Sequence, residues 1–226
     1  MANQPTIYIV ASDASRNGKT LLARLIVDYL LLDGKDPFVL DTDAPEGPLR
    51  QYFPGRTALT DFDEIAGRVK LFDTILAAPG RDYVIDLPQR HMLAFFKAVA
   101  ELNFFNAANK MGFRIIVLFV VDWVLPSLRA AQDVFEVPGI DLFVAVINES
   151  IGSAWPEEEG ALKIPILPRK LAILIADRRF SLRNFVLGND QGIGVSDKPD
   201  LNRFLFAVLD NLNTLDVDVS LQRLKP

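Results

Sequence analysis

The chain has 226 residues, 50% of them hydrophobic, and a formal net charge of -5. This length favours a single domain over residues 1–226, and the acidic total argues against a surface that binds nucleic acid throughout. The absence of cysteine excludes disulfides, thiolate metal sites and cysteine nucleophiles.

From the N-terminus onward, apolar runs with little polar alternation predict strands, and longer helical patterns separate them. The strand candidates are Thr6–Ala11, Pro37–Leu40, Asp82–Ile85, Arg114–Val121, Leu142–Ile147 and Ile164–Leu167. The helix candidates lie near residues 19–33, 58–76, 91–111, 124–136, 168–180 and 199–213. Strands buried on both faces and separated by helices are typical of an α/β fold, in which helices flank a doubly wound, mainly parallel sheet.

Neither an export signal nor a membrane span is predicted. The N-terminal MANQPTIYIV lacks a basic start followed by a long apolar region. The longest apolar run, Ile115–Val121, is far shorter than the ~20 residues of a membrane helix. We therefore expect a cytoplasmic protein without a transmembrane segment.

Polar residues follow the predicted strands at their carboxyl ends. Asp41 and Asp43 follow the second strand, Asp86 the third, Asp122 the fourth and Asn148 the fifth. Ligands of doubly wound sheets bind beyond the carboxyl ends of the strands. This edge of the sheet is therefore the predicted functional site.

The most informative motif is ASDASRNGKT at residues 11–20, between the first strand and the first helix. Its end, Gly18-Lys19-Thr20, matches the end of the phosphate-binding loop G-x-x-x-x-G-K-[ST], whose backbone N–H groups surround phosphate oxygens. Lys19 would neutralise phosphate charge, and Thr20 would offer its hydroxyl to Mg²⁺. The alternative is a chance Gly-Lys-Thr after a strand. The predicted nucleotide-binding residues of this region are Asp13, Ala14, Ser15, Arg16, Asn17, Gly18, Lys19, Thr20 and Leu21.

Asp13 stands where the loop motif has its first glycine. A carboxylate that faced phosphates would be unfavourable, so we expect its side chain to point away from them or to cap the turn. Aspartate tolerates left-handed backbone geometry better than most residues.

Acidic residues at the strand ends predict a magnesium site. Asp86 ends an apolar strand, as a Walker B aspartate does, and such a residue holds Mg²⁺ directly or through water. Asp41 and Asp43 are two positions apart and could both face Mg²⁺ or an attacking water. The alternatives are a strand-terminal turn before Pro88 and a capping role for either of the other two aspartates.

These residues resemble the ParA/MinD branch of P-loop ATPases. The resemblance rests on IYIVASDASRNGKTLLARLIVDYLLLDGKDPFVLDTDAPEG and RDYVIDLP, and it extends to AVINES and IPILPRKLAILIADRRFSLRNFV. It implies the P-loop NTPase fold and ATP and Mg²⁺ as ligands. It implies catalytic roles for Lys19 and for Asp43, which would position the attacking water. Thr20, Asp41 and Asp86 would form the magnesium environment, and Asn148 would lie near the adenine.

The loop departs from the family pattern K-G-G-x-G-K-[ST], whose first lysine reaches across an ATP-bound dimer. Ala14 stands at the position of that lysine, and Arg16 is the nearest cation. The dethiobiotin synthetase relatives also lack the crossing lysine. A homodimer and ATP hydrolysis therefore remain expectations from the resemblance, with Arg16 as the candidate substitute.

The resemblance leaves functions of different classes open. The first is a Mg-ATP-dependent switch for plasmid or chromosome partition or for intracellular positioning, with a partner protein that stimulates hydrolysis. The second is an ATP-dependent ligase similar to dethiobiotin synthetase, for which a further phosphate-site lysine is expected; Lys97, Lys110 and Lys163 are poorly placed candidates. The third is a scaffold that binds nucleotide without hydrolysing it.

Features outside the loop support weaker expectations. Arg178, Arg179 and Arg183 could contact DNA nonspecifically, as basic residues of related partition ATPases do, or they could form a solvated helix face. His91, the single histidine, is interpreted as a surface residue at the start of a helix. Residues 215–226 are a candidate flexible tail.

Overall fold

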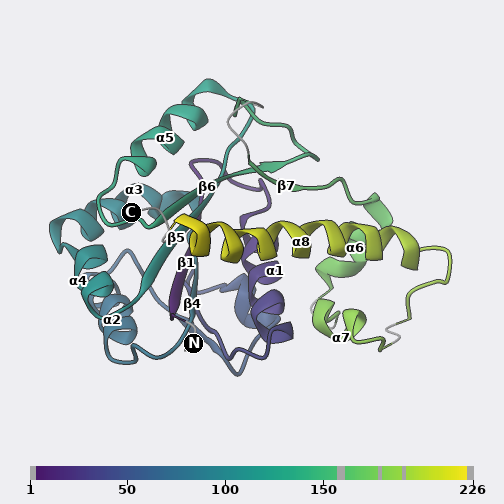
Figure 1. The fold of residues 1–226 in the computed structure, drawn as a ribbon, viewed down its shortest axis with the longest axis horizontal. Coiled ribbons are helices and arrows are strands. Elements are labelled where there is room, and N and C mark those ends of the chain that lie inside the picture. The colour runs from purple at the N-terminus through teal and green to yellow at the C-terminus, as the bar shows by residue number, and fades with distance from the viewer. Residues whose placement is uncertain (1–3, 157–160, 178–179, 190–191, 223–226) are drawn as a thin grey trace.

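The computed structural model describes residues 4–156, 161–177, 180–189 and 192–222. Its described strands form one seven-stranded sheet in the order β3-β2-β4-β1-β5-β6-β7, and every paired strand is parallel to its neighbour (Figure 1). The strands are β1 Thr6–Ala11, β2 Phe38–Asp41, β3 Thr57–Leu59, β4 Tyr83–Asp86, β5 Arg114–Val120, β6 Leu142–Asn148 and β7 Leu162–Ile164. The predicted α/β fold with a parallel sheet is confirmed.

Helices cover both faces of the sheet. Successive strand residues point to opposite faces, and because both sets are apolar, each face has to be buried under helices. Tyr8 and Val10 pack with α1, α6, α7 and α8, whereas Ile7 and Ile9 pack with α2, α3, α4 and α5. Figure 1 shows α1 and α8 on one side of the strands and α2 to α5 on the other. The helices are α1 Lys19–Leu32, η1 Pro48–Gln51, α2 Ile65–Leu76, α3 Gln89–Glu101, α4 Phe104–Lys110, α5 Leu125–Phe135, α6 Arg169–Ala176, α7 Leu182–Val186 and α8 Lys198–Gln222.

Strand β1 lies between β4 and β5, where the order of strands along the sheet reverses. Such a reversal leaves a crevice at the carboxyl ends of the strands, and doubly wound folds bind ligands there. The register places Val10 beside Asp86, and Asp86 beside Asp41. The loop at residues 12–18 begins at this point, so the fold brings the motif and both aspartates to one edge of the sheet.

Most predicted strands are present, but the prediction for residues 164–167 is wrong. Strand β7 covers Leu162–Ile164, and Pro165 follows its last residue. Proline has no N–H group to donate to a neighbouring strand, so the ladder ends there. The edge strand β3 was not predicted, because three residues are too few to show a periodic pattern.

Two long helix predictions are also wrong in extent. The segment at 58–76 begins as β3, and its helix α2 starts only at Ile65. The segment at 91–111 divides into α3 and α4, because Asn103 takes a left-handed conformation with φ 52°. The four phenylalanines of this segment, at positions 95, 96, 104 and 105, are all buried in the core.

The C-terminal predictions need smaller corrections. The helix predicted at 168–180 ends at Ala176, and the short helix α7 follows it. Helix α8 continues to Gln222, so the candidate tail at 215–226 is helical as far as that residue, and residues 223–226 lie outside the described part. His91 lies in the first turn of α3 as expected, but it is buried with 2% exposure and not on the surface.

Candidate functional site

Gly18 connects the loop to α1 and has a backbone conformation that favours glycine. Its φ of 99° lies in the left-handed region, and a Cβ atom at this position would lie 2.7 Å from Nδ2 of Asn148. A side chain would therefore be strained by the backbone and would also meet Asn148. The glycine of the sequence motif is required by both conditions.

The interior of the loop is held by polar side chains. Asn17, with 1% exposure, donates from Nδ2 to Oγ of Ser12 and, at 3.4 Å, to the carbonyl of Val120 at the end of β5. The hydroxyl of Ser12 also accepts from the N–H of Ala14 at 3.1 Å. These bonds fix the loop shape from within. Ser12 was missed by sequence reasoning because it lies outside the matched part of the motif.

Lys19 lies folded over the loop. Its Nζ donates to the carbonyl of Ala14 and, at 3.1 Å, to Oδ1 of Asn17. Burial lowers the pKa of Lys19, and the negative charges of Asp86 and Asp13 oppose this shift. A buried ammonium that is held by neutral oxygens of the loop could exchange these partners for phosphate oxygens.

Asp13 points away from the loop mouth. Its Oδ1 accepts a hydrogen bond from Oγ of Ser127, in the first turn of α5. The expectation that the Asp13 carboxylate points away from bound phosphate stays a prediction, which this bond to α5 favours. The residue at the place of the first glycine therefore connects the loop to α5.

Thr20 and Asp86 form the oxygen-rich part of the site. The hydroxyl of Thr20 donates to Oδ2 of Asp86 at 2.8 Å. Burial raises the pKa of Asp86 to about 7, and the bond from Thr20 partly offsets this rise. Hydroxyl and carboxylate oxygens suit Mg²⁺, which keeps several waters and binds few protein groups. Among the described residues, no group of three or more His, Cys, Asp or Glu side chains is arranged to hold a metal ion.

Asp41 is completely buried and holds the chain segment that follows it. Its two carboxylate oxygens accept from the N–H of Asp43 at 3.0 Å and from the N–H of Leu49 at 2.8 Å. This is the capping role that sequence analysis left as an alternative. The magnesium role of Asp41 stays a prediction, and only Thr20 and Asp86 among the three predicted residues are joined by a hydrogen bond.

Asp43 forms an ion pair that the sequence did not reveal. Its Oδ1 accepts from Nη1 of Arg90, and Nη2 of Arg90 donates to the carbonyl of Ala44 at 3.3 Å. Arg90 is the second residue of α3 and follows Asp86 by four positions. No motif or spacing links positions 43 and 90, so only the fold could identify this pair.

A polar cavity of about 460 Å³ opens at the loop mouth. It is lined by residues 15–16 and 18–21, by Asp43 and by residues 88–90. Arg16 faces solvent with φ 57°, a left-handed conformation that is uncommon for a residue with a side chain. Positive side chains thus surround a cavity beside the N-terminus of α1, an arrangement that attracts anions.

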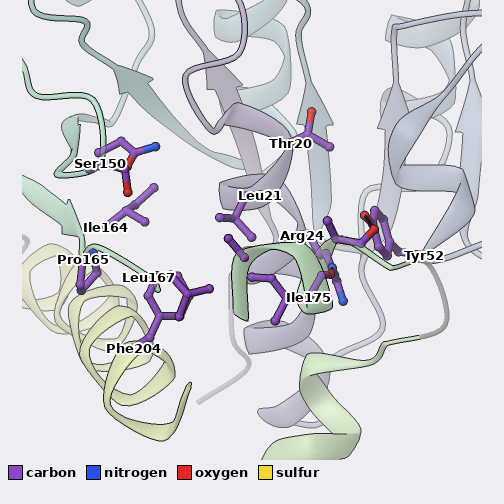
Figure 2. A pocket seen from close by; sticks show the side chains of 13 residues that line it. Thr20, Leu21, Arg24, Tyr52, Ser150, Ile164, Pro165, Leu167, Ile175 and Phe204 are labelled. Carbon is purple, nitrogen blue, oxygen red and sulfur yellow. Dashed lines mark hydrogen bonds between the residues drawn. The ribbon is translucent and has the colours of Figure 1, made fainter. Parts of the chain in front are cut away.

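A second cavity, of about 260 Å³, shares Thr20 and Leu21 with the first and is mostly apolar. Figure 2 shows Ser150, Ile164 and Pro165 on one side of Leu21 and Tyr52 on the other. Apolar residues of α6 and α8 and of the segment after β7 form much of the remaining wall, to which Arg24 of α1 also contributes. A cavity with several charged side chains and a mostly apolar slot therefore lie next to each other, with Thr20 and Leu21 in both linings.

Asn148 lines the second cavity, but its amide is already engaged. Nδ2 donates to the carbonyl of Asn17, and Oδ1 accepts from the N–H of Ser150, both at 3.0 Å. Its place near the adenine stays a prediction, and its hydrogen bonds connect the loop to the segment after β6. Ser150, which sequence analysis did not select, lies beside it at the slot.

The other predicted features are placed as follows. Arg183 is exposed on α7, whereas Arg178 and Arg179 lie outside the described residues, so DNA contact stays a prediction. Within the described residues, no helix has the length and apolar character needed to cross a membrane.

Comparisons with known proteins give fold likenesses only. No family model and no curated protein matches the chain. One similar solved structure is the MinD cell division protein of Aquifex aeolicus, with a TM-score of 0.49, 16% identity, and coverage of 84% of this chain and 100% of that one. A plasmid partition protein from Borrelia burgdorferi has a TM-score of 0.41, 11% identity, and coverage of 94% and 99%. The APS kinase CysC of Mycobacterium tuberculosis has a TM-score of 0.36, 19% identity, and coverage of 64% and 87%. These scores support no assignment of function, which therefore depends on the geometry of the site.

Proposed function

We propose that the chain binds a magnesium nucleoside triphosphate, preferably ATP, and acts as a nucleotide-dependent switch. The observation that carries this proposal is the junction of the two cavities at Thr20 and Leu21. One cavity has the positive groups and helix N-terminus that phosphates require, and the other has the apolar walls that a base requires.

The polyphosphate would lie in the polar cavity. Lys19 would exchange the loop oxygens for phosphate oxygens, and Arg16 lies at the solvent side of the same cavity. Thr20 and Asp86 would hold Mg²⁺, which would neutralise charge on the phosphates. The strained backbone of Arg16 supports a role for its side chain in this cavity, because such strain persists mainly at functional positions.

The base would lie in the apolar slot. Leu21, Ile164 and Pro165 offer apolar contacts, and Ser150 also lines the slot and offers a hydroxyl. Adenine is proposed from the resemblance of the sequence, and Asn148 would act by holding the loop and Ser150 next to it. Competition between ATP and GTP for the same site tests the choice of base.

The segment at residues 43–49 would transmit the nucleotide state. Asp43 reaches the polar cavity, while Asp41 holds Leu49 at the other end of the segment. A bound terminal phosphate could change the contacts of Asp43 and thereby the position of the segment. A homodimer, a partner protein that stimulates hydrolysis, and a role in partition or positioning are proposed as consequences of this switch.

The ligase alternative has less support. Lys97, Lys110 and Lys163 are exposed, and none of them lines either cavity. A substrate-side lysine of the kind expected for such a ligase is therefore absent from these positions.

The switch is tested by ATP turnover and by size-exclusion chromatography of the 226-residue chain with and without Mg-ATP. A switch should change its elution volume with Mg-ATP but not with Mg-ADP. ATP binding that neither changes the elution volume nor leads to ATP hydrolysis would favour the non-hydrolysing scaffold. Release of ADP that depends on an added metabolite would favour the ligase.

A further inference from the structure

The ion pair between Asp43 and Arg90 lies in the polar cavity and not on a remote surface. Both side chains line the cavity together with Lys19, and they are 31% and 49% exposed. The pair is therefore accessible to a ligand that enters the cavity. Side chains with this degree of exposure can also change partners without disturbing the core.

We propose that Arg90 is a phosphate-binding residue that exchanges Asp43 for the terminal phosphate of a bound nucleoside triphosphate. This inference rests on the proposed function. It assigns Arg90 to the terminal phosphate, which is the group that a triphosphate has and a diphosphate lacks.

The charges around the cavity favour this exchange. Lys19 is held by the loop through Ala14 and Asn17, so its position is fixed near the loop. Arg90 lines the same cavity from α3, and in the part of the chain that the structure describes it donates to the Asp43 carboxylate and to one backbone carbonyl. A guanidinium binds phosphate oxygens through parallel N–H groups, and such bonds are stronger than those to a neutral carbonyl.

The exchange would couple the ligand to the segment at residues 43–49. When Arg90 leaves, the bonds to the Asp43 carboxylate and to the carbonyl of Ala44 are lost together. The Asp43 carboxylate is then free to accept hydrogen bonds within the cavity. A diphosphate, which lacks the terminal group, would leave the ion pair intact, so Arg90 would confer preference for the triphosphate.

A double-mutant cycle measures the proposed contact separately from the ion pair. Calorimetry with Mg²⁺ gives the dissociation constants of ATPγS and of ADP for the wild type, Arg90→Gln, Asp43→Asn and the double variant. Arg129→Gln is the matched control, because this exposed arginine of α5 lines neither cavity and undergoes the same exchange. Arg90→Lys keeps the charge but loses the planar group.

We expect Arg90→Gln to weaken ATPγS binding by about tenfold, as for one charge-assisted hydrogen bond, and to leave ADP binding almost unchanged. The loss should be at least as large when Asp43 is already Asn, because Arg90 then has no ion pair to give up when it binds the phosphate. Arg90→Lys should retain part of the affinity, and Arg129→Gln should match the wild type.

Two results would overturn the role of Arg90 alone. One is an equal loss of affinity for ADP and ATPγS, and the other is a loss that disappears in the Asp43→Asn background, which would make Arg90 a clamp for the segment only. A wild type that binds neither nucleotide would instead overturn the proposed function and this inference with it.

Discussion

At the scale of single residues, each residue of the site has a contact or a backbone conformation that explains why it stands there. Gly18 needs its left-handed backbone and the space beside Asn148, and Asp41 caps the segment that begins at Asp43. Thr20 and Asp86 meet through one hydrogen bond across the β1–β4 junction. Exchanging one of these residues should therefore produce a distinct and separable effect.

Gly18→Ala should destabilise the protein more than Gly188→Ala. Both glycines have positive φ, at 99° and 85°, but a Cβ would meet Asn148 at Gly18 and nothing within 4 Å at Gly188. We expect a loss of about 1 kcal/mol in the free energy of unfolding at Gly188 and at least about 2 kcal/mol at Gly18. Urea unfolding of both variants gives the comparison. Equal losses would show that the contact with Asn148 is unimportant.

Asp86→Asn and Asp41→Asn should separate the metal role from the capping role. Asp86→Asn should remove the dependence of ATP binding on Mg²⁺, because the amide is a poor substitute for the carboxylate. Asp41→Asn should retain this dependence but lower the free energy of unfolding by about 1–3 kcal/mol, since a buried charge-assisted bond is weakened. The measurements are ATP titrations with Mg²⁺ or EDTA, together with urea unfolding. Loss of Mg²⁺ dependence in Asp41→Asn would assign that residue to the metal.

The residues of the loop motif could be selected from the sequence because their order in the chain is also their order in space. Physical grounds also predict that the Asp13 carboxylate points away from phosphates, and its hydrogen bond with Ser127 agrees with this prediction. Arg90 and Ser127 could not be selected, because their partners Asp43 and Asp13 are brought near only by the fold.

At the scale of elements, strongly apolar strands were predictable and short or interrupted elements were not. Five of the strand predictions match β1, β2, β4, β5 and β6 to within a residue or so. Strand β3 could not be predicted, because three residues are too few to show the alternation of a strand. The break between α3 and α4 at Asn103 could not be predicted, because phenylalanines lie on both sides of it and continue the apolar pattern. Local composition cannot show either, since both depend on packing against neighbours.

Helix α1 also anchors α6 and α7 through buried charge. Arg24 donates to the carbonyls of Ile175 and Phe180 and lies 3.9 Å from the centre of the Tyr52 ring. Asp28, one turn further along α1, is buried, and the backbone of Arg183 donates to it. This arrangement ties the wall of the apolar slot to the helix that follows the phosphate loop.

Asp28 should make stability depend on pH. Burial raises its pKa from 3.8 to about 6, although Arg24 opposes the rise. Between these values the folded protein binds the proton more strongly than the unfolded chain, so the contribution of this group to stability falls as pH rises toward about 6. The wild type should lose about 2 kcal/mol relative to Asp28→Asn between about pH 4.5 and pH 7. Urea unfolding at both pH values gives this difference. A difference that does not change with pH would contradict the assignment.

At the scale of the whole molecule, the strand order creates the site. Because β1 lies between β4 and β5, the loop after β1 meets Asp86 on one side and, through Asn17, the end of β5 on the other. The segments after β6 and β7 then supply the apolar slot (Figure 2). The parallel α/β class was predictable from the alternation of elements, whereas the union of the two cavities depends on long-range packing.

Calorimetric titration of the wild-type protein with Mg-ATP tests the central claim most directly, with Lys19→Ala as the control. Saturable binding to one site per chain that Lys19→Ala abolishes is the expected result, because the ammonium of Lys19 lies in the polar cavity. No heat of binding to the wild type, or equal affinity in Lys19→Ala, would contradict a triphosphate site at this loop.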